Sequence, residues 1–225
     1  GLQESSGVSV LPDLVNTATP VVEFVEARTI AAPASASGAT AGAGRGGSMT
    51  LADLDRDDDL DLIDVTMGTV RVSLNEKGRF TDATTTLGIS VKAGNGGADS
   101  GSGAAAVLVG DYDNDERPDI FVIGSSPSAH ALYHQGDDGR FENRSAAAKL
   151  PAPTSLLRAG AFADIDHDGD LDLFLTGGSN QLLRNNGDGT FADVTADAKL
   201  NAVTGLQALA VAPTDYDNRR DLDLI

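Results

Sequence analysis

Short runs of apolar residues recur along the chain and alternate with loops rich in aspartate and glycine. Two dense runs, Ile120–Ile123 and Leu171–Leu175, each follow such a loop, and small apolar stretches such as Ala104–Val109 precede the loops. Apolar runs of about five residues between turn signals are typical of short β-strands. A βαβ array is disfavoured because no helical pattern of about 10–15 residues separates the runs. The pattern therefore predicts an all-β fold.

The runs belong to an internal repeat of about 50 residues. Aspartate-rich loops begin at Asp53, Asp111, Asp164 and Asp215, which lie 58, 53 and 51 residues apart. Each repeat holds four predicted strands, and four-stranded repeats of this length are typical of β-propeller blades. We therefore predict a single β-propeller region over residues 1–225. Its expected parts are a partial blade at 1–30, a flexible loop at 31–47, blades at 48–87, 104–150 and 159–200, and a partial blade at 206–225.

The two partial blades leave two architectures open. They could pair with each other and close a four-bladed ring, or the stretch could be part of a larger propeller, with about three full blades and two half blades. We favour the larger propeller because the chain stops at Ile225, inside a predicted second strand. An open blade edge exposes backbone hydrogen-bonding groups, which propellers avoid by closing.

The composition excludes several classes of protein. The net charge of −18 without a basic patch argues against nucleic-acid binding. No apolar run reaches the roughly 20 residues of a transmembrane helix, and the absence of cysteine excludes disulfides and thiolate zinc sites. Of the 34 acidic residues 28 are aspartate, the acid that favours turns and oxygen-ligand metal loops rather than helices. The excess of aspartate therefore indicates turns and metal-binding loops.

The loops share the spacing D-x-D-x-D-G-x-x-D, whose nine positions we number from the first aspartate. Ca²⁺ takes 6–8 oxygen ligands, and this spacing can supply carboxylates from positions 1, 3, 5 and 9 and a main-chain carbonyl from position 7. An EF-hand is rejected because no glutamate stands at position 12 and strands flank the loops. The candidate ligands are Asp53, Asp55, Asp57, Asp59 and Asp61 in the first loop, Asp111, Asp113, Asp115, Arg117 and Asp119 in the second, and Asp164, Asp166, Asp168, Asp170 and Asp172 in the third, with the position-7 residues Asp59, Arg117 and Asp170 contributing only their carbonyl oxygens.

The loops are not equally suited to a cation. The third has Gly169 at position 6, where a sharp turn favours positive φ, while the first has Asp58 and the second has Glu116. A glutamate there costs about 1–2 kcal/mol if the turn is left-handed. The fourth loop, Asp215–Asp223, has two arginines at positions 5 and 6 and is expected to be empty or weak. We therefore predict two or three structural Ca²⁺ sites, each worth roughly 0.4–1.4 kcal/mol at about 1 mM Ca²⁺.

A resemblance to a known family supports this interpretation. The segment Asp164–Leu175, followed by Leu182–Thr195, closely resembles FG-GAP/VCBS repeats, which build integrin-α-like β-propellers and occur in an ASPIC/UnbV-type bacterial branch. The resemblance covers most of residues 48–225. It implies Ca²⁺ bound between the first and second strands of each blade. It also implies an extracytoplasmic location, either periplasmic, secreted or at the cell surface.

No arrangement of residues points to catalysis. His130 and His134 are interpreted as polar residues of a third-strand region, and His167 occupies a non-ligand position of the third loop. We therefore expect no enzyme but a binding or scaffold module for a protein or glycan partner. The alternatives are a subunit of a larger extracytoplasmic or membrane-associated assembly and a carbohydrate-active propeller enzyme. The expected contact surface is the loop face opposite the aspartate loops, which includes Lys92, Gly124–His130, Arg158, Gly177–Asn180 and Lys199.

Overall fold

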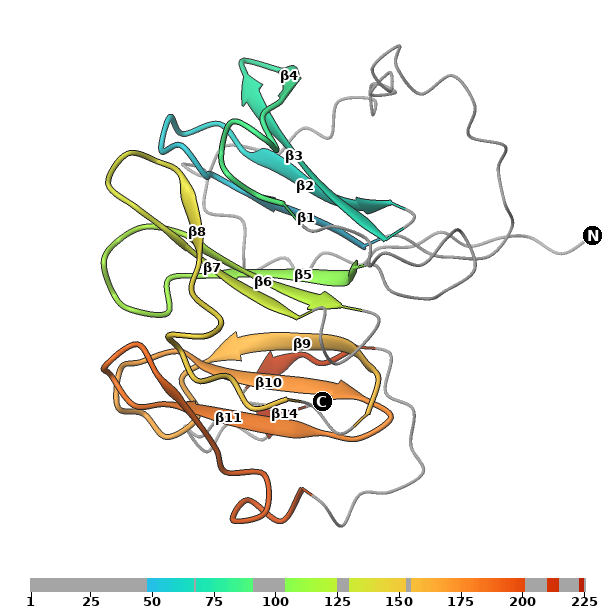
Figure 1. Cartoon of the computed structure of the whole chain (residues 1–225), viewed down its shortest axis with the longest axis vertical. Coiled ribbons are helices and arrows are strands. Elements are labelled where there is room, and N and C mark those ends of the chain that lie inside the picture. The colour runs from blue at the N-terminus through green and yellow to red at the C-terminus, as the bar shows by residue number, and fades with distance from the viewer. Residues whose placement is uncertain are drawn as a thin grey trace, which may run out of the picture. The chain divides into compact units, whose positions relative to one another are not determined.

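The computed structural model describes residues 48–66, 68–90, 104–124, 130–152, 155–200, 210–214 and 223–224. The chain divides into two units, 1–43 and 44–225, and all of the described residues belong to the second. They form three four-stranded antiparallel sheets and one two-stranded sheet, without an α-helix (Figure 1). The prediction of an all-β fold built from four-stranded blades is thereby confirmed. The predicted partial blade at 1–30 and flexible loop at 31–47 lie outside the described residues.

Each blade contains four strands in chain order. The first blade contains β1 (Ser48–Ala52), β2 (Asp61–Thr66), β3 (Thr69–Glu76) and β4 (Arg79–Asp82). The second contains β5 (Ala104–Gly110), β6 (Asp119–Gly124), β7 (Ala131–Gln135) and β8 (Phe141–Asn143). The third contains β9 (Leu157–Ala163), β10 (Asp172–Gly177), β11 (Gln181–Asn185) and β12 (Phe191–Asp193). The third blade thus begins two residues before the predicted 159.

The two-stranded sheet repeats the start of a blade. It pairs β13 (Pro213–Thr214) with β14 (Asp223–Leu224), and Thr214 stands opposite Asp223. The three complete blades have the same register, because the residue before each loop always faces the aspartate at position 9. The described sheets do not close into a ring. Among the described residues, no helix has the length and apolarity needed to span a bilayer.

The middle strands are dense apolar runs because they are buried on both faces. In β6, Ile120 and Val122 belong to the core cluster that includes residues of the first blade. Phe121 and Ile123, which point the opposite way, belong to the cluster that includes residues of the third blade. A sheet covered on both faces loses the alternation of apolar and polar residues.

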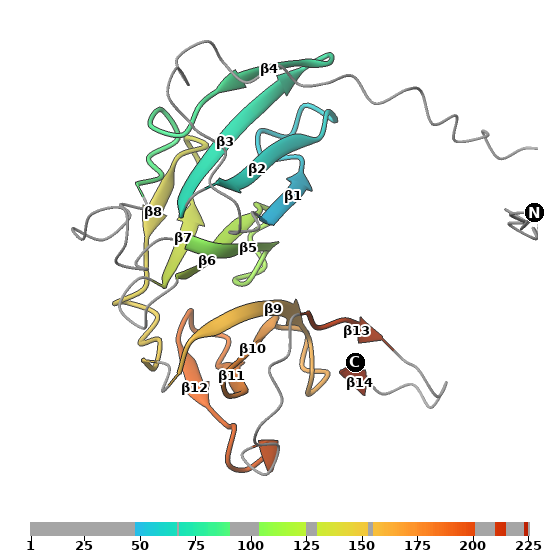
Figure 2. The same ribbon diagram turned by 90° about the vertical axis from the view of Figure 1, so that its right-hand side faces the viewer.

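Neighbouring blades also meet along their first strands and through their tails. Strand β5 packs against both β1 and β9 (Figure 2). The amide N–H of Phe141 donates to the carbonyl of Leu87 at 2.7 Å, and that of Phe191 donates to Ala148 at 2.9 Å. These two backbone bonds therefore connect the second and third blades to the end of the blade before them. These contacts hold successive aspartate loops in a regular series.

Candidate metal-binding loops

The first, second and third loops have the same backbone conformation. Position 6 has positive φ in all three, at Asp58 (70°), Glu116 (66°) and Gly169 (96°), as the sequence predicted. Position 4 is also left-handed, which sequence reasoning missed. The residues there are Arg56, Asn114 and His167, with φ of 63°, 58° and 61°. Two left-handed residues per loop turn the chain tightly enough to bring alternate side chains together.

The aspartate at position 1 organises each loop. Asp164 accepts hydrogen bonds from the amides of Asp168 and Gly169, both at 3.1 Å. Asp111 accepts the equivalent bonds from positions 5 and 6 at 3.0 and 2.8 Å, and Asp53 does so at 3.2 and 3.1 Å. These bonds fix the carboxylate at the centre of the turn.

The aspartate at position 9 is the buried member of each site. Asp61 and Asp119 are 0 % exposed and Asp172 is 2 % exposed. Their Oδ2 atoms accept hydrogen bonds from the position-2 amides at 2.7, 3.2 and 3.0 Å. Their Oδ1 atoms each accept a hydrogen bond of 2.8 Å from a backbone amide near the end of the third strand. The donors are the amides of Asn75, Gln135 and Asn185. Each loop is thus tied to its own blade by a buried carboxylate.

Side-chain amides tie two of the loops to the following blade. Nε2 of Gln135 donates to the carbonyl of Leu54 at 2.7 Å, and Nδ2 of Asn185 donates to the carbonyl of Tyr112 at 2.7 Å. Leu54 and Tyr112 occupy position 2 of the first and second loops, and their side chains are buried between blades. We call these two hydrogen bonds the amide latches. Sequence reasoning missed them because the partners lie 81 and 73 residues apart.

The buried carboxylates carry charge that the protein environment disfavours. Burial raises the pKa of Asp61 and Asp172 above the ordinary value, and it raises the pKa of Asp119 to about 7. Burial, together with neighbouring carboxylates, also raises the pKa of Asp55. A divalent cation among these oxygens would favour the ionised forms. The electrostatics therefore fit a cation in each loop.

The structure brings together most of the predicted side-chain ligands. Oxygens within 4.8 Å of one another come from Asp53, Asp55 and Asp57 in the first loop, Asp111, Asp113 and Asp119 in the second, and Asp164, Asp166 and Asp172 in the third. Asp168, at position 5 of the third loop, is not in these groups, and neither is Asp61, while Asp115 forms a further group of this kind with Asp113 and His134. The carbonyl role of the position-7 residues stays a prediction. The fourth loop, apart from Asp223, lies outside the described residues.

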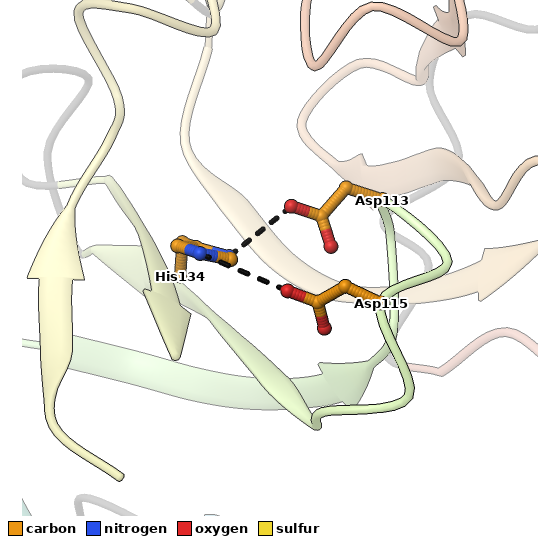
Figure 3. A group of neighbouring side chains, drawn as sticks. All are labelled: Asp113, Asp115 and His134. Carbon is orange, nitrogen blue, oxygen red and sulfur yellow. Dashed lines mark ion pairs between the residues drawn. The ribbon is translucent and has the colours of Figure 1, made fainter. Parts of the chain in front are cut away.

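Two basic residues, Arg117 and His134, approach the aspartates of the second loop. Arg117 forms ion pairs with Asp115 and, at 2.9 Å, with Asp137, and its Nε donates to the carbonyl of Gln135 at 2.8 Å. His134 projects from β7 toward Asp113 and Asp115 (Figure 3). The guanidinium of this position-7 residue thus pairs with Asp115 of the loop, and the ligand role of its carbonyl stays a prediction. Sequence reasoning interpreted His134 as a polar strand residue and did not predict its contact with the loop. His134 directly precedes Gln135, whose backbone amide donates to the loop.

Comparison with known families agrees with this repeated geometry. The FG-GAP-like repeat family matches residues 53–122, 111–175 and 164–225. The chain belongs to the FG-GAP-like repeat family. Each match begins at the first aspartate of a loop and continues into the second strand of the next repeat, so the family unit coincides with the blade spacing. The suspected resemblance is thereby confirmed for the part of the chain that holds the blades.

Comparisons with individual proteins add less. No protein of curated function matches the chain. Among solved structures, a lectin from Agrocybe aegerita, studied for its specific recognition of non-reducing terminal N-acetylglucosamine, matches with 22 % identity and a TM-score of 0.41. The match covers 65 % of this chain, and it spans 37 % of the lectin chain.

Proposed function

We propose that this FG-GAP-like region is a calcium-stabilised, non-enzymatic scaffold that works outside the cytoplasm and presents loops to a protein or glycan partner. The observation that carries the proposal is the threefold recurrence of one carboxylate cluster on one hydrogen-bonded backbone. Among the described side chains, no ion pair reaches an aspartate of the first or third loop. Their clustered negative charge is best balanced by a bound cation.

Calcium suits the first and third loops because their side-chain ligands are all carboxylates. Ca²⁺ accepts flexible coordination by six to eight oxygens, whereas Mg²⁺ demands near-ideal octahedral geometry. The loops offer side-chain oxygens at positions 1, 3 and 5 or 9, and further oxygens can come from main-chain carbonyls and water. Asp53, Asp55 and Asp57 would hold the ion in the first loop, and Asp164, Asp166 and Asp172 would hold it in the third.

Bound calcium would also stabilise the contact between blades. Position 2 of a loop donates its N–H to the buried aspartate at position 9 and, in the first two loops, accepts an amide latch through its carbonyl. An ion that orders the loop therefore orders an inter-blade hydrogen bond as well. Extracellular Ca²⁺ modules commonly bind with Kd of about 10⁻⁴–10⁻³ M. Sites of that affinity would be filled at about 1 mM Ca²⁺, the level this extracytoplasmic proposal assumes.

The proposed contact surface lies at the opposite ends of the blades, where the second and third strands are joined. In the third blade this connection is held by a 2.6 Å contact between the hydroxyls of Ser155 and Ser179 and by Thr176, whose hydroxyl donates to Asn180 at 2.7 Å. Ordered loops on a rigid sheet scaffold are common positions for binding residues. A role as a subunit of a larger assembly would use the same surfaces, and an enzyme would require a reactive site that this proposal does not include.

The calcium part is tested by calorimetric titration and thermal unfolding of the chain in Ca²⁺ and in EDTA. We expect Ca²⁺ to raise Tm and EDTA to lower it. The Asp166→Asn variant should lose one equivalent of bound Ca²⁺, while Asp197→Asn, a change at an exposed aspartate outside the loops, should lose none. A Tm that is the same in both conditions, together with no measurable Ca²⁺ binding, would overturn the calcium part.

The binding part needs its own experiment. The Ca²⁺-loaded chain is screened against a glycan array and, by affinity capture, against extracytoplasmic protein extracts. Asn180→Ala, on the proposed contact surface, should weaken a binding event that Asp197→Asn leaves unchanged. A partner whose binding is unaffected by Asn180→Ala but lost in Asp166→Asn would place recognition on the aspartate-loop face instead.

A further inference from the structure

We propose that the second loop is a mixed nitrogen and oxygen site, which takes a transition-metal ion such as Zn²⁺ through His134, Asp113 and Asp119. The first and third loops remain all-oxygen sites. This inference rests on the proposed function only in that both treat the loops as cation sites. The proposal arises from His134, which the loop motif does not include.

The distances fit three ligands around one small ion. Nδ1 of His134 lies 3.2 Å from Oδ2 of Asp113 and 3.3 Å from Oδ1 of Asp119. Zinc binds histidine nitrogen at about 2.0–2.1 Å and carboxylate oxygen at about 2.0–2.2 Å. Two such ligands at a tetrahedral angle stand about 3.3 Å apart, from the same bond lengths. The nitrogen is therefore already at the separation from each of the two oxygens that one tetrahedral ion requires, and oxygens of Asp113 and Asp119 lie within 4.8 Å of each other.

The imidazole is aimed at these oxygens but does not form hydrogen bonds with them. Nδ1 of His134 is buried and has no hydrogen-bond partner among the described residues, although two carboxylates lie close to it. A buried polar nitrogen without a partner is unfavourable, so the arrangement calls for a group that satisfies it. A metal ion between the nitrogen and the two oxygens would satisfy all three atoms.

The residues around the histidine support the same role. Asp115 is the carboxylate beside the other ring nitrogen, and its Oδ2 lies 3.8 Å from Nε2, a charge contact longer than a hydrogen bond. Metal-binding histidines commonly place their second nitrogen against a carboxylate, which orients the ring. Asp115 is in turn held by Arg117. Arg117 thus pairs with Asp115, while the histidine keeps its contacts with Asp113 and Asp119.

The equivalent positions in the other blades exclude such a ligand there. Leu74 precedes Asn75 in β3, and Arg184 precedes Asn185 in β11, just as His134 precedes Gln135 in β7. Neither leucine nor arginine can ligate a cation. Imidazole favours zinc, copper and nickel, whereas sites of carboxylate and carbonyl oxygens favour calcium and magnesium. The chemical difference between the loops therefore predicts a difference in the metal they select.

The test uses the whole chain, freed of metal and titrated with Zn²⁺ by calorimetry and with Co²⁺ by visible absorption. We expect one Zn²⁺ site and an intense Co²⁺ spectrum of tetrahedral type. His134→Gln should weaken Zn²⁺ binding by at least about tenfold, the lower limit for changes in the surroundings of a metal ligand. His167→Asn serves as the matched control, because this histidine is exposed in the third loop and outside the ligand set.

Calcium titrations of the same variants separate the two proposals. His134→Gln should leave Ca²⁺ binding by the first and third loops unchanged, while Asp166→Asn should lose Ca²⁺ at the third loop and keep Zn²⁺. Zn²⁺ binding that His134→Gln does not weaken overturns the mixed site, as does a chain that takes up no Zn²⁺ or Co²⁺. If His134→Gln lowers the Tm of the metal-free chain and leaves metal uptake unchanged, the histidine is an internal counter-ion instead. Failure of Ca²⁺ binding with retained Co²⁺ binding would overturn only the calcium scaffold.

Discussion

The second and third loops use one backbone for two different electrostatic environments. Both have left-handed residues at positions 4 and 6 and a buried aspartate at position 9. The third loop has no ion pair among the described side chains, whereas the second is surrounded by Arg117 and His134. The repeat motif therefore determines the turn, while the residue at its variable position 7 and the residue on the neighbouring strand determine which charges lie beside the turn.

The largest effect is expected from removing the buried aspartate. Asp172→Ala leaves the amides of Ile165 and Asn185 without their carboxylate acceptor, at about 1–3 kcal/mol for each buried group. Urea unfolding of this variant should give a free energy of unfolding that is lower by about 2–6 kcal/mol. Ca²⁺ should no longer stabilise the protein through this loop. The same change at Asp119 should remove the response to Zn²⁺ instead. Asp197→Ala is the control, and equal metal responses in both loop variants would remove the distinction between the loops.

The next comparison uses pH in the absence of metal. Because burial raises the folded-state pKa of Asp61, Asp119 and Asp172, the unfolded chain holds fewer protons on them than the folded chain does. Their protonated forms therefore contribute fully to the free energy of unfolding below about pH 4. This contribution is lost as the pH rises toward about 7, the folded pKa of Asp119. Urea unfolding of the metal-free chain from pH 4 to 8 should show this fall. Added Ca²⁺ should protect most at the upper end, and a metal-free stability that rises with pH over this range would contradict the assignment.

A smaller effect is expected at the amide latches. Asn185→Ala leaves the buried carbonyl of Tyr112 without its donor, and Gln135→Ala does the same to Leu54, at about 1–3 kcal/mol each. Asn186→Ala, which removes a donor from an exposed turn, is a suitable control. Hydrogen exchange should show faster opening of the loop in the preceding blade. Protection that is lost only within the mutated blade would mean that the latch does not connect neighbouring blades.

The smallest predicted effects come from position 6. Glu116 has a φ of 66°, so Glu116→Gly should raise stability by up to about 1 kcal/mol. Gly169 has a φ of 96°, so Gly169→Ala should lower stability by about 1 kcal/mol or more. Thermal unfolding of the two variants checks both signs. Parallel shifts in the same direction would show that the turn strain does not differ between the loops in this way.

The features that were predictable from sequence are the local ones. The strands and the position-6 turn follow from apolar runs and from Asp58, Glu116 and Gly169, because these signals lie within a few residues of each other. His134 and the latch residue Asn185 were not predicted. Their partners are reached only after the third strand folds back onto the loop, and a side chain's direction depends on the register of that pairing. The sequence therefore predicted the blade and most candidate ligands but not what surrounds them.

The amide latches imply an order of assembly. The first loop is closed within its own blade by Asp61 and Asn75, which are 14 residues apart, but the carbonyl of Leu54 waits for Gln135, 81 residues away. During synthesis the first and second loops therefore leave the ribosome well before the residues that complete them. The second and third blades each supply the donor for the loop of the blade made before, so these two loops would be completed one blade behind the growing chain.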